Sequence, residues 1–182
     1  AYACLISGKW RWTWLLLPLY LLALGGRKGH PGLKALQGWF YAHRGLHSKG
    51  VPENSMAAFR AALEGGYGIE LDIRLTSDGY AVVVHDADLK RVAQNDAVIS
   101  ETPLEKLQSI HPVPLLKDVL ALLKPGKHLQ IELKGSDLGI VPELKRILDN
   151  WSGDRKQLAI SSFEEETIKE AGKYFTDLPR VL

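Results

Sequence analysis

Gly68-Ile-Glu-Leu-Asp-Ile-Arg-Leu-Thr76 alternates apolar with charged side chains. Side chains alternate between the two faces of a β-strand, so Glu70, Asp72 and Arg74 would share one face while the isoleucines and leucines share the other. Taken alone, the stretch predicts either an edge strand with one face in water or a buried strand that carries functional charges. The other apolar segments of the chain distinguish these two interpretations.

Three more apolar segments carry ionisable residues at or near their C-terminal ends. These residues are His43 and Arg44, His85 and Asp86, and Glu132 and Lys134. Parallel α/β folds place their active sites at the C-terminal ends of strands. Four strands with the same arrangement therefore indicate one shared functional site rather than four separate strands with solvent-exposed faces.

The order of the expected elements indicates an α/β fold. Strands are expected at 40–43, 69–73, 81–85, 129–133 and 158–161, with a sixth beginning at Arg180. Helices are expected at 55–63, 103–109, 115–123, 141–150 and 164–174, the first of them capped by Asn54 or Ser55. Strands that alternate with helices predict a parallel sheet with right-handed crossovers, as an open doubly wound sheet or as a (β/α)8 barrel.

The composition is that of a globular protein and excludes several functional classes. The 182 residues suit one domain, and 46% of them are hydrophobic and 24% charged. The formal net charge of +2 is too small for a nucleic-acid surface, so no nucleic-acid partner is expected. Cys4 is the only cysteine, which excludes an internal disulfide bond and a zinc site built from several thiolates.

Residues 12–24 form an apolar run between basic residues. Three interpretations stay open: a membrane anchor, which we favour, a cleaved signal peptide of a secreted protein, and a buried helix. We therefore expect a hydrophobic N-terminal segment at 1–26, a linker at 27–38 and a catalytic domain at 39–182. A single N-terminal anchor would make the protein membrane-associated.

The charged strand ends offer carboxylates that could bind a divalent metal ion. Buried carboxylates need cations, and the hard oxygen atoms of Glu70, Asp72 and Glu132 suit Mg²⁺ or Ca²⁺. A metal ion held at the end of a parallel sheet would lie where such folds carry out their chemistry. We therefore expect a divalent ion as the cofactor.

The remaining charged residues favour cleavage of a phosphodiester. His43 and His85 could divide proton removal and proton donation, because the pKa of histidine lies near neutrality. Arg44 and Lys134 would supply fixed positive charge to phosphoryl oxygens. Enolisation or another metal-assisted lyase reaction needs similar groups and stays open. The other histidines are expected in turns or linkers without a catalytic role: His30, His47, His111 and His128.

These residues resemble those of a known family, the glycerophosphodiester phosphodiesterases. The resemblance rests on the order and spacing of its motifs. The motifs are His43-Arg44-Gly45, Pro52-Glu53-Asn54-Ser55 with Ala58-Phe59, Ile69-Glu70-Leu71-Asp72 with Thr76-Ser77-Asp78-Gly79, Val83-Val84-His85-Asp86 with Leu89 and Arg91, and Ile131-Glu132-Leu133-Lys134.

The resemblance implies a (β/α)8 barrel that hydrolyses glycerophosphodiesters to glycerol 3-phosphate and an alcohol. The substrates would be small-molecule phosphodiesters or, as in some membrane-associated relatives, lysolipids. Arg74 and Asp86 would adjoin the site, and Asn54 is expected only to cap the helix that follows it. The resemblance implies metal binding by Glu70, Asp72 and Glu132, acid and base catalysis by His43 and His85, and phosphate binding by Arg44 and Lys134.

Two features depart from the usual pattern of the family. The segment 87–114 is shorter than the insertion that usually covers the site, which bears on substrate selection. A complete barrel takes about 250 residues, so we expect the barrel to be incomplete at its C-terminal end in this chain. Two alternatives to a hydrolase stay open: a non-catalytic membrane-anchored fragment, and a phosphoryl lyase that releases a cyclic phosphate.

Overall fold

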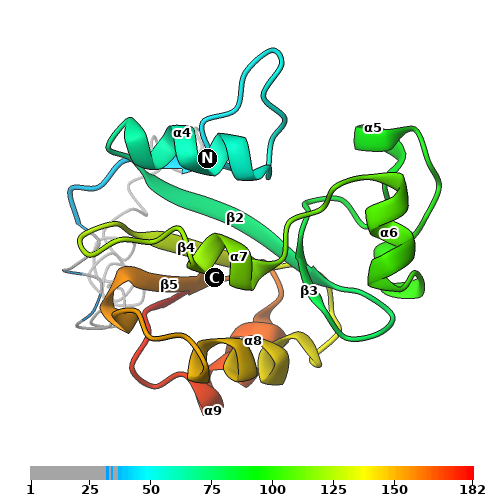
Figure 1. Cartoon of the computed structure of the whole chain (residues 1–182). Coiled ribbons are helices and arrows are strands. Elements are labelled where there is room, and N and C mark those ends of the chain that lie inside the picture. Colours follow the sequence, from blue (N-terminus) through cyan, green and yellow to red (C-terminus); the bar gives the residue numbers. More distant parts are fainter. Residues whose placement is uncertain (1–31, 33, 35–36) are drawn as a thin grey trace, which may run out of the picture. The chain divides into compact units, whose positions relative to one another are not determined.

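The computed structural model describes residues 32, 34 and 37–182 (Figure 1). The hydrophobic N-terminal helix predicted within residues 1–26 lies outside these residues, as does most of the predicted linker. Within the part that is described, no helix is long and apolar enough to cross a membrane.

A six-stranded sheet forms the centre of the described part. The strand order β1-β2-β4-β5-β6 is parallel throughout, which confirms the predicted α/β fold with a parallel sheet. The last strand begins at the predicted residue. The strands are β1 (Tyr41–His43), β2 (Gly68–Leu75), β3 (Ala81–Val83), β4 (Leu129–Leu133), β5 (Leu158–Ser161) and β6 (Arg180–Val181).

The strand predicted at 81–85 departs from this parallel order. It appears as the three-residue β3, which lies off the main path and pairs antiparallel with the end of β2. A tight turn reverses the chain: Gly79 has a φ of +82°, its amide donates to the Thr76 carbonyl at 3.0 Å, and the Tyr80 amide donates to Thr76 Oγ1 at 2.9 Å. Asp78-Gly79 between two apolar runs is a hairpin signal, so the expectation of one more parallel strand was wrong.

The helices lie close to their predicted positions, apart from one that was not predicted. α4 begins after Ser55, whose hydroxyl accepts a hydrogen bond from the Ala58 amide at 3.2 Å. The unpredicted helix is α5, a short element within the segment 87–114. The helices are α4 (Met56–Glu64), α5 (Lys90–Ala93), α6 (Leu104–Ile110), α7 (Leu116–Leu120), α8 (Ile140–Asp149) and α9 (Glu165–Tyr174), with 3₁₀ turns η2 (Ile99–Glu101) and η3 (Arg155–Gln157).

The main core lies on the apolar face of the sheet. Ile69, Leu71 and Ile73 of β2 are fully buried there with the apolar residues of β4 and β5. Side chains from α4, α7, α8 and α9 complete the same cluster. Because β2 lies between β1 and β4 and is buried over most of its length, the explanation of its charges by an edge strand with one wet face is wrong.

The segment 87–114 has a small core of its own. Val82 and Val84, at β3, pack there with buried residues of the segment, among them Leu89, Ile99 and Leu107. Figure 1 shows α5 and α6 side by side next to the β2–β3 hairpin. This second core fixes the segment beside the C-terminal part of β2.

Candidate active site

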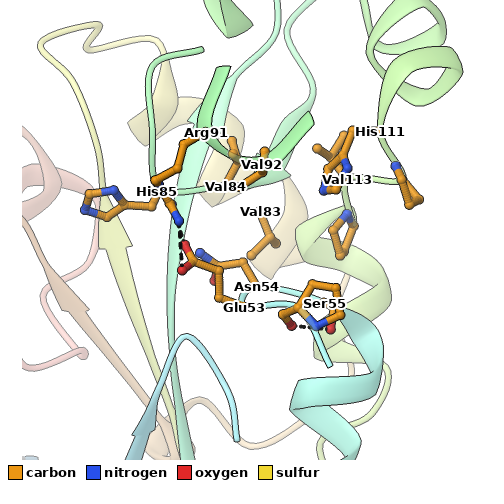
Figure 2. Close-up of a pocket in the computed structure, with 13 residues that line it drawn as sticks. Glu53, Asn54, Ser55, Val83, Val84, His85, Arg91, Val92, His111 and Val113 are labelled. Carbon is orange, nitrogen blue, oxygen red and sulfur yellow. Dashed lines mark hydrogen bonds and ion pairs between the residues drawn. The ribbon is translucent and has the colours of Figure 1, made fainter. Parts of the chain in front are cut away.

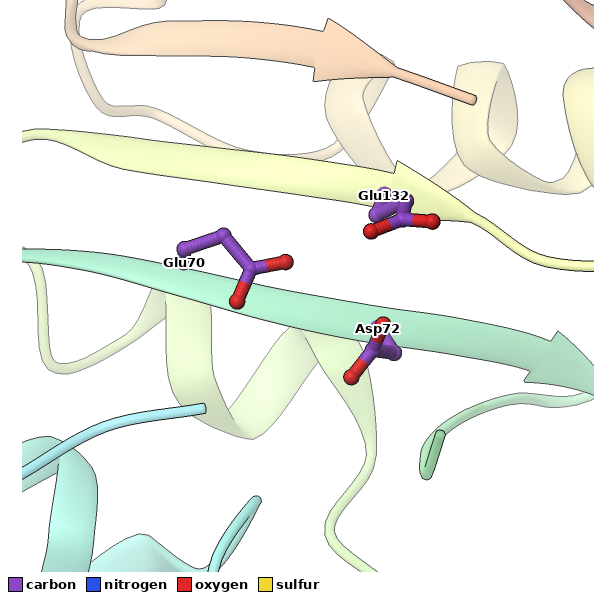
Figure 3. A group of neighbouring side chains, drawn as sticks. All are labelled: Glu70, Asp72 and Glu132. Carbon is purple, nitrogen blue, oxygen red and sulfur yellow. The ribbon is translucent and has the colours of Figure 1, made fainter. Parts of the chain in front are cut away.

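Strand register alone brings four of the predicted site residues together. Asp72 of β2 pairs with Glu132 of β4, and His43 of β1 pairs with Glu70 of β2. Residues paired across adjacent strands project from the same face, and so do residues two apart on one strand. All four side chains therefore stand on the face opposite the apolar core, and Figure 3 shows the three carboxylates meeting between β2 and β4.

The three carboxylates are crowded and shielded from water. Glu70, Asp72 and Glu132 are 7%, 0% and 8% exposed, and one oxygen atom of each lies within 4.8 Å of those of the other two. Burial raises the pKa of Glu70 to about 7, and the charge of Asp72 adds to this effect, while a hydrogen bond from the Arg44 amide opposes it. Without a cation, the site therefore disfavours full ionisation.

The protein's own cations do not satisfy all of these oxygen atoms. Lys134 Nζ lies 2.5 Å from Glu132 Oε1 and 3.3 Å from Asp72 Oδ1, yet the angles are not those of hydrogen bonds, and both oxygens remain buried without a hydrogen-bond donor. Arg44 Nε lies 3.4 Å from Asp72 Oδ2. Buried oxygen ligands with unused lone pairs fit a hard divalent cation such as Mg²⁺ or Ca²⁺.

Arg44 is held over the carboxylates by a turn that requires glycine at the next position. Arg44 and Gly45 both have left-handed backbones, with φ of 57° and 79°. A Cβ atom on Gly45 would lie 2.8 Å from the Cβ of Ala58, so no larger residue fits without a shift. This turn aims the Arg44 amide at Glu70 Oε2, at 3.0 Å, while its guanidinium reaches toward the adjacent carboxylate.

His85 reaches the same end of the sheet by a route that the sequence did not predict. It does not end a parallel strand. Instead β2 runs two residues past the end of β4, at Leu133, and the hairpin folds β3 back along this overhang. The Val84 amide then donates to the Asp72 carbonyl at 3.0 Å, which brings the chain back to the level of the carboxylates.

The partner of His85 selects one imidazole tautomer. His85 Nδ1 lies 2.7 Å from Asp86 Oδ1. Burial alone would raise the pKa of Asp86, but hydrogen bonds from His85 and Arg91 outweigh burial and lower it. Because an ionised carboxylate only accepts hydrogen bonds, Nδ1 is the donor, and Nε2 is the ring nitrogen that this contact leaves unused.

His43 ends β1 and lies next to Glu70 of β2. Its side chain is largely exposed, and its Nε2 lies 4.0 Å from Glu70 Oε2. His128, in contrast, precedes β4 at the opposite end of the sheet and packs against Trp39 with 4.4 Å between ring centroids. The structure therefore brings the two histidines with predicted catalytic roles to one end of the sheet and leaves His128 out.

The expectation that Asn54 only caps the following helix was wrong. Ser55 caps α4. Asn54 is buried in a left-handed conformation, with a φ of 51°, and its Nδ2 donates to Asp72 Oδ2 at 3.0 Å, while its Oδ1 is buried without a hydrogen-bond partner. Asn54 is thus part of the carboxylate site, and the Pro52-Glu53-Asn54-Ser55 motif was the signal for it.

Two further charged residues, Glu53 and Arg91, belong to the site although no role was predicted for them. Arg91 binds Glu53 through two nitrogen atoms, at 2.6 and 3.1 Å, and Asp86 at 2.6 Å. Glu53 in turn accepts a hydrogen bond from Arg44 at 3.0 Å. Both residues stood in motifs of the family resemblance, which was the available signal.

A pocket of about 540 Å³ opens beside Lys134 at this end of the sheet. Its polar lining includes Arg74, whose Nε donates to the His85 carbonyl at 2.9 Å. A second pocket of about 440 Å³ lies behind β3 and is lined by both His85 and His111. Figure 2 shows that the ring of His85 points away from His111, which lies on the far wall of this pocket. The first pocket is lined by Arg74, Leu75, Ala87, Ile99, Ser100, Lys134, Gly135, Ser136 and Asp137.

The sequence around this site matches a family of known proteins. The model of the glycerophosphoryl diester phosphodiesterase family matches residues 43–182. A glycerophosphodiester phosphodiesterase of Caldanaerobacter subterraneus subsp. tengcongensis is 32% identical over 149 residues, which cover 72% of this chain and 60% of that protein. Human glycerophosphodiester phosphodiesterase 1 is 40% identical over 143 residues, which cover 70% of this chain and 43% of that protein.

Solved structures give the same result. The crystal structure of a glycerophosphodiester phosphodiesterase from Thermotoga maritima has a TM-score of 0.67 at 29% identity and covers 79% of this chain and 61% of its own. An Oleispira antarctica phosphodiesterase, solved with the product sn-glycerol-3-phosphate, has a TM-score of 0.71 at 25% identity and covers 81% and 66%. The chain thus spans about 60% of the length of the Caldanaerobacter and Thermotoga proteins.

Proposed function

Because the chain belongs to the glycerophosphoryl diester phosphodiesterase family, we propose that it hydrolyses glycerophosphodiesters to glycerol 3-phosphate and an alcohol. The observation that carries the proposal is the buried cluster of Glu70, Asp72 and Glu132, which lies between the cations Arg44 and Lys134. Further support comes from the Oleispira relative, which was solved with the product sn-glycerol-3-phosphate.

The three carboxylates would hold a divalent ion, Mg²⁺ or Ca²⁺. Such an ion, when bound, supplies positive charge that polarises a phosphoryl oxygen. Arg44 and Lys134 would bind the other phosphoryl oxygens, where negative charge grows during phosphodiester cleavage. Lys134 also borders the pocket of about 540 Å³, which offers polar groups to one substituent of the phosphodiester.

His43 and His85 would act as the acid and base pair. A proton must leave the attacking water and another must reach the departing alcohol, so two groups with a pKa near neutrality are suited to the task. His85 would use Nε2, because Asp86 occupies its Nδ1. His43 would act from the end of β1 beside Glu70, where its exposed ring can meet substrate.

We extend the proposal to the architecture and location of the protein. The parallel strands would belong to a (β/α)8 barrel, since about 80% of the chain superposes on solved relatives. The apolar run at 12–24 would anchor the protein to a membrane, with a cleaved signal peptide as the alternative. Lysolipid phosphodiesters would then join small glycerophosphodiesters as substrates.

The test is hydrolysis of glycerophosphocholine and of a lysophospholipid by the intact protein. We expect release of glycerol 3-phosphate from glycerophosphocholine with Mg²⁺ or Ca²⁺ and none with a chelator. His43→Ala and His85→Ala should each lower kcat by about 10²- to 10⁴-fold. His47→Ala is the matched control, because His47 is an exposed histidine in the loop after β1 and has no predicted catalytic role.

Two other outcomes would overturn the proposal. Metal binding by folded protein without turnover would favour a non-catalytic binding module. A cyclic phosphate as the first product, detected by phosphorus NMR, would favour a lyase in which a substrate hydroxyl attacks the phosphorus instead of water.

A further inference from the structure

We propose that Arg91 is a positioning residue of the active site, an inference that rests on the proposed function of His85 and Arg44. Arg91 holds Asp86, the partner of His85. Arg91 also holds Glu53, the partner of Arg44. One guanidinium thus stabilises the orientation of a proton-transfer group and of a phosphate-binding group at the same time.

The contacts of Arg91 are a fork to one carboxylate and a single contact to a second. Nη2 lies 2.6 Å from Glu53 Oε1 and Nη1 lies 3.1 Å from Glu53 Oε2, an ion pair that Figure 2 shows. Nε lies 2.6 Å from Asp86 Oδ2. Lysine has one ammonium group and cannot reproduce this planar arrangement of three donors.

The ion pairs extend from Arg91 in two directions. In the first, the other oxygen of Asp86 accepts from His85 Nδ1 at 2.7 Å, so the carboxylate is shared between the two side chains. In the second, Glu53 Oε1 is shared between Arg91 and Arg44 Nη1, at 2.6 and 3.0 Å. The hydrogen bond from Arg91 lowers the pKa of Glu53 against the effect of partial burial, so this carboxylate stays ionised and accepts from both arginines.

The segment 87–114 holds Arg91 in place. Arg91 belongs to α5, which directly follows Leu89, a fully buried residue of the second core. The Ala93 amide donates to the Leu89 carbonyl at 2.8 Å, which ties the helix to this anchor. A segment expected to act in substrate selection therefore also supports the catalytic groups.

The role of Arg91 in orientation can be separated from a role in stability. Its side chain is 51% exposed, and ion pairs at such positions contribute little to folding. Orientation is more sensitive, because a displacement of about 1 Å of a catalytic group can cost 10²-fold in rate. We therefore expect a large effect on turnover and a small effect on the melting temperature.

The experiment compares Arg91→Met and Arg91→Lys with wild type in the intact protein. We expect Arg91→Met to lower kcat by roughly 10- to 100-fold with little change in KM, and to shift the melting temperature by no more than about 2 °C. Arg91→Lys should recover only part of the lost kcat. Arg146→Met is the control, because Arg146 forms a similar fork with Glu143 at 2.7 and 2.8 Å on the surface of α8.

A nitrogen-15 NMR spectrum of the imidazoles tests the same proposal without turnover. Wild type should show His85 as a single Nδ1–H tautomer, and Arg91→Met should show a mixture, because Asp86 is no longer fixed. The signal is assigned by its loss in His85→Gln. An unchanged His85 tautomer in Arg91→Met, or full kcat in Arg91→Lys, would overturn the proposal. Absence of turnover in wild type would overturn the proposed function instead, and the NMR comparison would still report on Arg91.

Discussion

Burial disfavours the ionised form of the Glu70 carboxyl group and so raises its pKa. The alternation along residues 68–76 predicted that Glu70 and Asp72 would share a face, because the side-chain period of a strand is two. Sequence could not give the contact with Glu132, because that depends on the register between β2 and β4. The raised pKa of Glu70 follows from this register and from the depth of the site.

The raised pKa predicts that metal binding depends on pH. With a pKa of about 7, the metal-free Glu70 holds a proton over part of its population at neutral pH, and a metal ion must displace that proton. Affinity for Mg²⁺ or Ca²⁺ should therefore rise from pH 6 to pH 8, with release of about half a proton per ion at pH 7. Titration calorimetry in two buffers of different ionisation enthalpy measures this release. An affinity independent of pH would contradict the prediction.

Asn54 leads to a second prediction at the residue scale. Its hydrogen bond to Asp72 orients a carboxylate, and loss of such a partner typically lowers metal affinity by about 10- to 100-fold. Its positive φ complicates a simple alanine substitution, because alanine disfavours that backbone. Asn54→Gly keeps the backbone relaxed and removes the amide, so it should lower metal affinity with less loss of stability than Asn54→Ala. Equal metal affinity in Asn54→Gly and wild type would exclude the role.

Elements were predicted well where one periodic pattern governed them. β4 and β5 have the predicted bounds, and α8 presents a continuous apolar stripe to the core. The hairpin was missed because the turn signal at Asp78-Gly79 was not used, and an apolar run such as β3 does not by itself show whether a strand is parallel or antiparallel. The pair of Glu53 and Arg91 was missed because the residues lie 38 positions apart, Glu53 in a loop and Arg91 on the helix α5, which was not predicted.

The turn after β1 gives a prediction at the scale of the element. Gly45→Ala must place a Cβ 2.8 Å from Ala58 while its backbone has a φ of +79°, so it should lower the free energy of unfolding by roughly 2–4 kcal/mol. Gly50→Ala is the matched control, because Gly50 has a φ of +90° but no atom within 4 Å of an added Cβ. It should cost only about 1 kcal/mol. Urea unfolding measures both, and equal losses would show that the contact with Ala58 does not matter.

At the scale of the whole molecule, the site opposes folding when no metal ion is present. The pKa of Glu70 is about 7 in the folded protein and near 4.5 in the unfolded chain, so the folded state binds more protons between these pH values. The free energy of unfolding therefore falls as pH rises through this window, by at most about 1.4 kcal/mol per pH unit. Burial lowers the pKa of His111 and His128, so for these two residues the unfolded state binds more protons just below pH 6.5. Their contribution to the free energy of unfolding therefore rises with pH there, opposite to that of Glu70.

A comparison with Glu70→Gln isolates this contribution, because both proteins keep the two histidines. In chelator, the stability of Glu70→Gln relative to wild type should increase from pH 5 to pH 8, since only wild type must bury a new charge. Saturating Mg²⁺ or Ca²⁺ at pH 8 should stabilise wild type more than Glu70→Gln, because a ligand at about 100 times its Kd stabilises the protein that binds it by about 2.7 kcal/mol. Urea unfolding with and without metal measures all four cases. If the metal ion stabilised both proteins equally, Glu70 would not be a metal ligand.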